Sequence, residues 1–350
     1  MAGVGGDKDI CGNLSQKQLL LIFIPTIFFL GLRSKVADTA GYYWAFSNLS
    51  DKFTILHLDS RAYGYAILQR FCKAYLFSAP EAWLTTLVVI SLIPLTYILT
   101  KYSIDIRISL FVFFASTEFT FLLNGSRQFV AVCLCFYAFQ YIVEEKPVKY
   151  YLWVFLAISF HATAIIMLPV YYIVRTRIWS MKMWLIVIVV AIVSIYSEQV
   201  FLVFNEKILV DSVYGHYAKD ILILPGVKVA RVLVHCMPPA ISFFMRKKIA
   251  QLDIKYVNYC VNLSVLNALI FIFASTIGGN LTGRLAEYFT IYNLLLYPIL
   301  IWKTFSSRSR KIVILGFVVF FMTFYIYQME IRWHGLEYIS QALGIYIYRR

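Results

Sequence analysis

The stretch that decides the fold runs from residue 124 to residue 172 and reads NGSRQFVAVCLCFYAFQYIVEEKPVKYYLWVFLAISFHATAIIMLPVYY. Two apolar runs, 128–143 and 148–160, flank a short turn that carries glutamates and lysines, and a third run, 162–174, follows His161. Long apolar runs separated by short charged turns are typical of membrane-spanning helices. This stretch therefore predicts a transmembrane protein built from helices.

The composition of the whole chain supports the same class. Of its 350 residues, 61% are hydrophobic and only 14% are charged, and the mean hydropathy is +0.74. A soluble domain is roughly half apolar and about a quarter charged. The net charge is nevertheless +14. So apolar a chain cannot be a disordered protein, a disulfide scaffold or a soluble nucleic-acid binder, and no nucleic-acid partner is expected.

The apolar runs predict an all-α, polytopic transmembrane bundle of about 11 spans (10–12), which forms a single integral membrane domain over residues 1–350. The expected spans are 16–32, 82–100, 107–123, 128–143, 148–160, 162–174, 183–200, 229–245, 256–276, 286–302 and 312–328. Two longer loops interrupt them. The first, 33–81, contains an amphipathic helix at about 62–77, and the second covers 199–228.

Lysine and arginine in the short loops set the orientation, because these residues are enriched on the cytoplasmic side. One set of five loops holds 15 of them, whereas the short turns on the opposite face hold only Arg127 and Arg284. The N-terminus is therefore predicted to be cytoplasmic and both longer loops periplasmic. With Lys8 and Lys17, 17 of the 32 basic residues lie inside, so 15 lie outside, where they should be rare.

Three of the outer arginines, Arg33, Arg127 and Arg284, are expected at helix ends on one face of the membrane. A guanidinium donates paired hydrogen bonds to phosphate and keeps its charge. Arg127 and Arg284 also begin helices, where free N–H groups favour an anion. We therefore expect these three residues to bind a lipid diphosphate. Snorkelling of each arginine to the interface, or an Arg284–Glu287 pair, is the alternative.

Two residues are candidate general bases for a reaction at that face. His161 follows an apolar stretch and titrates near neutral pH, but it could equally be a hydrogen-bonded core histidine. Asp38 competes for the same role, and its alternative is a carboxylate that caps the segment beginning at Thr39. The sequence leaves the choice between them open.

Other polar and aromatic residues of the outer face are expected to contact a glycan or to support the site, although an interfacial aromatic belt also explains the tyrosines. These residues are Gln128, Tyr42, Tyr43, Glu287, Tyr288, Tyr214 and His216.

Metal chemistry has no signature in the sequence. The six cysteines show no metal or redox spacing, and the loops contain no DxD or HxxxH pattern. No metal and no cofactor are therefore expected.

Four stretches resemble the EpsG-like branch of the Wzy O-antigen and polysaccharide polymerases. They are GLRSKVADTAGYYWAF from residue 31, YGYAILQRF from residue 63, the stretch quoted above, and GRLAEYFTIYNLLLYP from residue 283. The most specific combines Asn-x-x-Arg-Gln with a later Phe-His. Two small residues, Ala162 and Thr163, follow the histidine where the family often has serine. Residue by residue, the family pattern singles out Arg33, Asp38, Arg127, Gln128, His161 and Arg284.

The resemblance implies a metal-independent glycosyltransferase of the lipid-donor type in the bacterial inner membrane, with a periplasmic active site. Such enzymes transfer an undecaprenyl-diphosphate-linked glycan to the non-reducing end of another lipid-linked repeat unit. Membrane lipids, a flippase and a chain-length co-polymerase of the same lipopolysaccharide or exopolysaccharide pathway are the implied partners.

Two other functions stay open. An O-antigen ligase would move the glycan to lipid A core, but ligases usually have a larger periplasmic loop than the roughly 30 residues of 199–228. A flippase or transporter of lipid-linked oligosaccharides would need charges along a path through the bilayer. Here Glu118 is the clearest charge inside a span.

Overall fold

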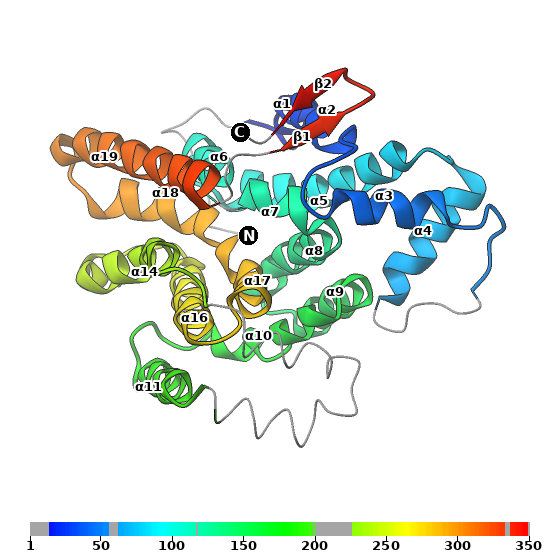
Figure 1. The fold of residues 1–350 in the computed structure, drawn as a ribbon. Helices are drawn as coiled ribbons and strands as arrows, with labels where there is room; N and C mark the ends of the chain where they lie inside the picture. Colours follow the sequence, from blue (N-terminus) through cyan, green and yellow to red (C-terminus); the bar gives the residue numbers. More distant parts are fainter. Residues whose placement is uncertain are drawn as a thin grey trace. The chain divides into compact units, whose positions relative to one another are not determined.

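The computed structural model describes residues 14–55, 62–116, 118–197, 199, 226–332 and 337–348, and most of them lie in helices (Figure 1). The chain divides into two compact units. The first contains Met1–Leu168 and Ser307–Arg350, and the second contains Pro169–Ser306. Each unit is described by itself, and the prediction of a single membrane domain stays a prediction.

The first unit holds most of the helices and a small hairpin of strands. Its elements are α1 (Gln16–Ile22), α2 (Ile24–Gly31), α3 (Thr39–Ser47), α4 (Tyr63–Tyr75), α5 (Pro80–Tyr102), α6 (Ile106–Ala115), α7 (Glu118–Asn124), α8 (Ser126–Val143), α9 (Pro147–Phe160), the 3-10 helix η2 (Ala162–Met167), α19 (Ser307–Ile326), the π-helical turn η5 (Tyr327–Arg332), β1 (Tyr338–Ser340) and β2 (Ile345–Ile347).

Helix α8 lies at the centre of this unit and packs against α5 and α9. Its most apolar window is 78% buried by protein, whereas that of the α19 helix is 17% buried, which leaves α19 free to face lipid. The α8–α9 hairpin closes at Glu145, which adopts a positive φ of 58°, and Pro147 then starts α9 at a position where its missing N–H costs nothing. The sequence EEKP thus turns the chain back.

Helix α4 packs closely against α9, and Gly64 makes this approach possible. A Cβ at Gly64 would lie 2.2 Å from Ser159 Oγ, far inside van der Waals contact. Small residues at helix contacts let backbones approach in this way. The amphipathic helix predicted at 62–77 is therefore present as α4, with Tyr65, Ala66 and Gln69 on its buried side.

A C-terminal hairpin is the exception to the helical fold. Strands β1 and β2 pair antiparallel, and β1 also bridges to the turn after α2, where Lys35 pairs with Ile339. Tyr338 stacks on Phe29 with 4.2 Å between ring centroids, and its hydroxyl donates to the Phe29 carbonyl at 2.7 Å. Figure 1 shows the hairpin beside α1 and α2. The prediction of a purely helical protein missed these strands.

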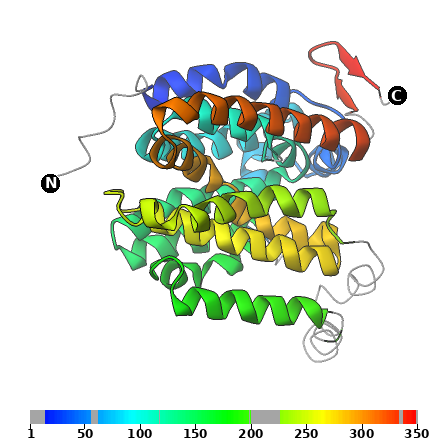
Figure 2. The ribbon, with the colours of Figure 1, turned by 90° about the vertical axis from the view of Figure 1, so that its left-hand side faces the viewer.

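The second unit is entirely helical within its described residues. Its elements are α10 (Val170–Ile173), α11 (Met181–Ile195), α14 (Val229–Phe244), α15 (Arg246–Ile249), α16 (Val257–Thr276), α17 (Gly279–Thr290) and α18 (Asn293–Thr304). Helix α16 packs against α11, α14 and α17, and Figure 2 shows α14 and α16 side by side along much of their length. Asn262 on α16 fixes the turn after α10 by donating to the carbonyls of Val174 and Thr176.

Four described helices are long and apolar enough to cross a membrane: Pro80–Tyr102, Ser126–Val143, Val257–Thr276 and Ser307–Ile331. Two bent pairs, α6 with α7 and α17 with α18, raise this number to six if each pair is one span. Four further apolar helices are shorter. The structure thus supports an integral membrane protein. The count of about 11 spans stays a prediction, because several expected spans are broken or short.

Candidate functional site

The first turn of α8 gathers the predicted site residues of the first unit. Its first three residues, Ser126, Arg127 and Gln128, each meet a different partner from elsewhere in the sequence. Gly125 precedes the helix and supplies no side-chain cap, so the first turn is left to side chains from other segments. The start of α8, which we call the hub, therefore contacts both the 33–42 segment and the 161–163 segment through hydrogen bonds.

Arg33 is fully buried, and each nitrogen of its guanidinium donates a hydrogen bond to a protein atom. Nε donates to Thr39 Oγ1 at 2.8 Å, Nη2 donates to Ser126 Oγ at 2.6 Å, and Nη1 donates to the Leu30 carbonyl. Burial lowers the pKa of Arg33 to about 10, so the side chain stays charged at neutral pH. Its phosphate-binding role stays a prediction, and the geometry gives it a clear structural role: it ties the turn after α2 to the start of α8.

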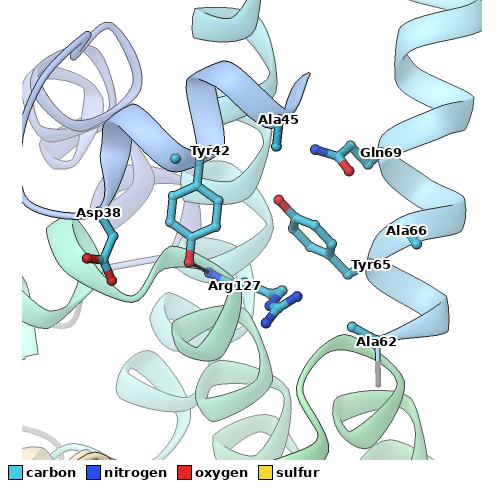
Figure 3. Close-up of a pocket in the computed structure, with 9 residues that line it drawn as sticks. Asp38, Tyr42, Ala45, Ala62, Tyr65, Ala66, Gln69 and Arg127 are labelled. Atoms are coloured by element: carbon cyan, nitrogen blue, oxygen red, sulfur yellow. Dashed lines mark hydrogen bonds between the residues drawn. The ribbon is translucent and has the colours of Figure 1, made fainter. Parts of the chain in front are cut away.

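Asp38 and Arg127 line one cavity of about 430 Å³, together with residues of α3 and α4 (Figure 3). This volume lies within the range of about 300–1,000 Å³ that is typical of small-molecule pockets. The other lining residues are Gly41, Tyr42, Ala45, Ala62, Tyr65, Ala66 and Gln69.

Arg127 is held in this cavity by two tyrosines. Its backbone N–H donates to Tyr42 Oη at 3.4 Å, which takes up one free donor of the helix start. Its guanidinium lies over the Tyr65 ring, with Cζ 5.4 Å from the ring centroid. Burial raises the pKa of Tyr65, so its hydroxyl stays neutral, and Trp83 Nε1 donates to that hydroxyl at 3.3 Å. Cation and aromatic wall are thus placed before any ligand arrives.

Asp38 precedes α3 but makes no capping hydrogen bond with its side chain. Its carboxylate turns instead toward α7. With the Asn124 amide oriented to satisfy both of its polar atoms, the nitrogen donates to Asp38 Oδ2 at 3.0 Å. The helix-capping alternative for Asp38 therefore does not apply, and its carboxylate is held in place at the cavity wall.

His161 joins the hub through a different partner. It ends α9 and precedes η2, and its Nδ1 lies 2.6 Å from Thr163 Oγ1. Gln128 Nε2 donates to the same oxygen at 3.5 Å. A hydroxyl oxygen can accept from both nitrogens. In that tautomer Nε2 of His161 keeps the lone pair that a base requires. His161 is not among the residues that line the cavity.

The predicted residues of the second unit lie on α17. Arg284 is partly exposed, whereas Glu287 is only 1% exposed and Tyr288 is fully buried. Glu287 does not take its ion pair from Arg284, as the pairing alternative supposed. Its Oε1 accepts from Arg231 Nη2 of α14 at 2.5 Å. Arg231 also lies over Phe271, with Cζ 5.0 Å from the ring centroid.

Three other predicted residues have separate outcomes. Tyr43 donates its hydroxyl to Glu81 Oε1 at 3.0 Å, and partial burial together with this carboxylate raises the pKa of Tyr43. It is therefore tied to α5 rather than to the cavity. Tyr214 and His216 lie outside the described residues, as does most of the predicted loop 199–228.

Sequence reasoning missed Gln69 and Arg231. Gln69 carried a readable signal, since it is the amide on the stripe of α4 that is otherwise formed by Tyr65, Ala66 and Cys72. Arg231 stands in the first turn of an apolar run, where a charge calls for a partner. Within the described residues, no group of three histidine, cysteine or acidic residues is placed to hold a metal ion.

Comparison with known proteins gives one match. The model of the family described as EpsG matches residues 17–335, which cover most of the chain and both units. No curated protein and no solved structure matches the chain significantly.

Proposed function

The chain belongs to the EpsG family, and from this membership we propose that it is a metal-independent glycosyltransferase that polymerises a bacterial surface polysaccharide. The family and the apolar helices indicate a membrane protein with a polysaccharide-polymerase role. The polymer is an O-antigen, a capsule or an exopolysaccharide. The donor is a glycan on undecaprenyl diphosphate, and the acceptor is the non-reducing end of a second lipid-linked repeat unit.

The reaction exchanges one bond at the anomeric carbon of the donor. The acceptor hydroxyl oxygen forms the new glycosidic bond as the bond from the anomeric carbon to the diphosphate oxygen breaks. The lipid diphosphate leaves with the electron pair, and the proton of the acceptor hydroxyl passes to a base of the protein. The protein therefore has to supply a cation for the leaving group and a base for the acceptor.

The shared cavity of Asp38 and Arg127 is the observation that carries this proposal. Arg127 stabilises the negative charge that develops on the departing diphosphate, as a fixed cation does without reorganisation. Asp38 accepts the proton of the hydroxyl late in the transfer, a step for which a weak base suffices. His161 orients the acceptor or relays the proton through Nε2, held by Thr163 and Gln128.

The other two arginines take different parts in the proposal. Arg33 positions the site, because its donors hold Thr39 and Ser126 on either side of the cavity segments. Arg284 contacts phosphate from α17, where it is partly exposed and lies near the buried carboxylate of Glu287.

We further propose that the enzyme works on the periplasmic face of the inner membrane with its N-terminus in the cytoplasm. The excess of lysine and arginine in one set of short loops supports this orientation. A flippase of the same pathway would then supply repeat units, and a chain-length co-polymerase would limit the product.

Reconstitution of the purified protein in vesicles with the lipid-linked repeat unit of the producing cell tests the proposal. We expect a ladder of products on a gel, spaced by one repeat unit. Transfer of glycan to added lipid A core without a ladder would identify a ligase. Movement of the lipid-linked unit across the vesicle membrane without polymer would identify a flippase, and either result overturns the proposal.

A further inference from the structure

One wall of the cavity has no role in bond breaking. It is formed by Ala62, which precedes α4, and by Tyr65, Ala66 and Gln69 of α4, and it faces Gly41 and Ala45 of α3. We infer that this wall is a subsite for an uncharged sugar ring of the glycan and that Gln69 recognises an oxygen atom of that ring. The inference rests on the proposed function and deepens it by assigning part of the cavity to the glycan rather than to the diphosphate.

The charges of the cavity favour a neutral occupant at this wall. Asp38 and Arg127 carry opposite formal charges, and every other lining residue is uncharged. Neither of these two charged residues belongs to α4, so this wall itself offers no charge to a phosphate group. An uncharged ring with several hydroxyls matches the remaining surface, which combines amide and phenol groups with small apolar side chains.

Gln69 supplies the polar group that calls for a ligand. The side chain is only 8% exposed, and its Nε2 has no hydrogen-bond partner among the described residues. Enclosing an amide N–H without a partner is unfavourable, because the group loses its hydrogen bonds to water. Figure 3 shows the Gln69 amide pointing from α4 toward α3, with its nitrogen on the side of Ala45. The last torsion of glutamine is broad, so a small rotation brings Nε2 to a ligand oxygen.

The rest of the wall is rigid and leaves space. Tyr65 meets Trp83 edge to face, with 5.4 Å between ring centroids, and the hydrogen bond from Trp83 fixes its hydroxyl end. On the opposite side, a Cβ built at Gly41 has no protein atom within 4 Å. Gly41 is exposed and lines the cavity, so a side chain introduced at this position displaces no protein atom.

Gly41 allows a test in which folding and binding separate. Gly41→Leu places a side chain into open space and also removes a helix-weakening glycine from α3, so the protein should fold at least as well. Gly316→Leu is the matched control, because a Cβ there also meets nothing within 4 Å, but Gly316 lies on α19. Gln69→Leu removes the amide at nearly constant volume, and loss of an unpartnered polar group should not destabilise the protein.

The binding experiment uses the full-length protein in detergent and two probes. One is the free oligosaccharide released by mild acid from the lipid-linked pool of the producing cell, and the other is inorganic diphosphate. We expect Gly41→Leu and Gln69→Leu to weaken oligosaccharide binding about tenfold or more, equivalent to at least about 1.4 kcal/mol. Both variants should bind diphosphate like the parent, and Gly316→Leu should bind both probes like the parent.

Unchanged oligosaccharide binding in both cavity variants, or no binding of the oligosaccharide by the parent, would overturn the subsite. Equal loss of diphosphate binding in the Gln69 variant would assign the wall to the leaving group instead. These results are distinct from a failure of the proposed function, which would appear as a parent protein that binds the oligosaccharide yet makes no ladder.

Discussion

Arg33 Nη2 donates to Ser126 Oγ at 2.6 Å, which joins the turn after the second helix to the first residue of α8 across 93 positions of sequence. Both side chains are fully buried. The same serine donates its own hydroxyl to the Leu122 carbonyl at 2.9 Å, so it links Arg33 to α7 as well. The cavity segments on either side of this bond are therefore positioned by a contact that no ligand needs to touch.

Loss of the hydrogen bond between Arg33 and Ser126 should lower the stability of the protein, because neither residue takes part in the bond exchange of the reaction. Ser126→Ala leaves a buried guanidinium nitrogen without its acceptor, which should lower the free energy of unfolding by about 1–3 kcal/mol. Thermal unfolding in detergent measures this change. Thr290→Ala is the control for loss of a buried hydroxyl. It removes one in the second unit and leaves the contact of Arg33 unchanged. A Ser126→Ala protein as stable as the parent would mean that Arg33 is not held by this contact.

Arg127 should behave in the opposite way. Arg127→Ala removes a cation from the cavity wall, and we expect ladder formation to fall by roughly 100- to 1,000-fold, the usual effect of losing one fixed group that stabilises developing charge. Arg127→Lys keeps the charge but cannot donate two parallel hydrogen bonds to a phosphate. Its activity should therefore lie between that of the parent and that of Arg127→Ala. Reconstituted polymerase assays measure both variants, with thermal unfolding as the check on folding. Full activity in Arg127→Ala would remove this residue from the mechanism.

Asp38 and His161 can be separated by their pH–rate profiles. Asp38 shares the cavity with Arg127, whereas His161 does not line it, so we expect Asp38→Asn to lower the rate by about 100- to 10,000-fold. His161→Gln keeps a hydrogen-bonding group toward Thr163 and should retain more activity, with the acidic limb of the profile unchanged. If His161→Gln abolishes that limb and Asp38→Asn keeps it, the two roles are reversed.

The Arg231–Glu287 pair is expected to stabilise the second unit. Arg231→Met leaves the buried Glu287 carboxylate without its partner and should cost roughly 3–5 kcal/mol. Glu287→Leu should cost less, because the Arg231 side chain is 25% exposed and water can solvate its charge. The double variant leaves no uncompensated charge and should recover most of the stability. A double-mutant cycle on the free energy of unfolding measures the coupling. Additive losses would show that the two side chains do not depend on one another.

Several helices of both units could be predicted from patterns along the sequence. Hydropathy predicted α5, α8 and α16 as spans, and helix-start chemistry pointed to Arg127. The amphipathic helix α4 also followed from its sequence pattern. These features are local, and each can be inferred from a window of about 20 residues.

The structural features that could not be predicted from the sequence depend on packing between residues far apart in the chain. An arginine at a helix end looks the same whether it faces phosphate or, like Arg33, the protein interior. Tyr288 was expected to contact a glycan or to support the site, and its full burial could not be predicted because its neighbours on other helices decide which side of α17 is covered. The break between α17 and α18, a bend of 52°, likewise divides an apolar run that hydropathy alone counts as one span.

The C-terminal hairpin has a consequence for biosynthesis. Ser34 Oγ donates to the Ile339 carbonyl at 3.1 Å, although the two residues are 305 positions apart. The ribosome must therefore make nearly all of these residues before the strand that pins the Arg33 turn exists. The turn can close only after residue 339 has been made, so the helices before it enter the membrane with that turn still open. A nascent chain interrupted in α19 would carry the residues of the cavity but lack the strand that fastens their first segment.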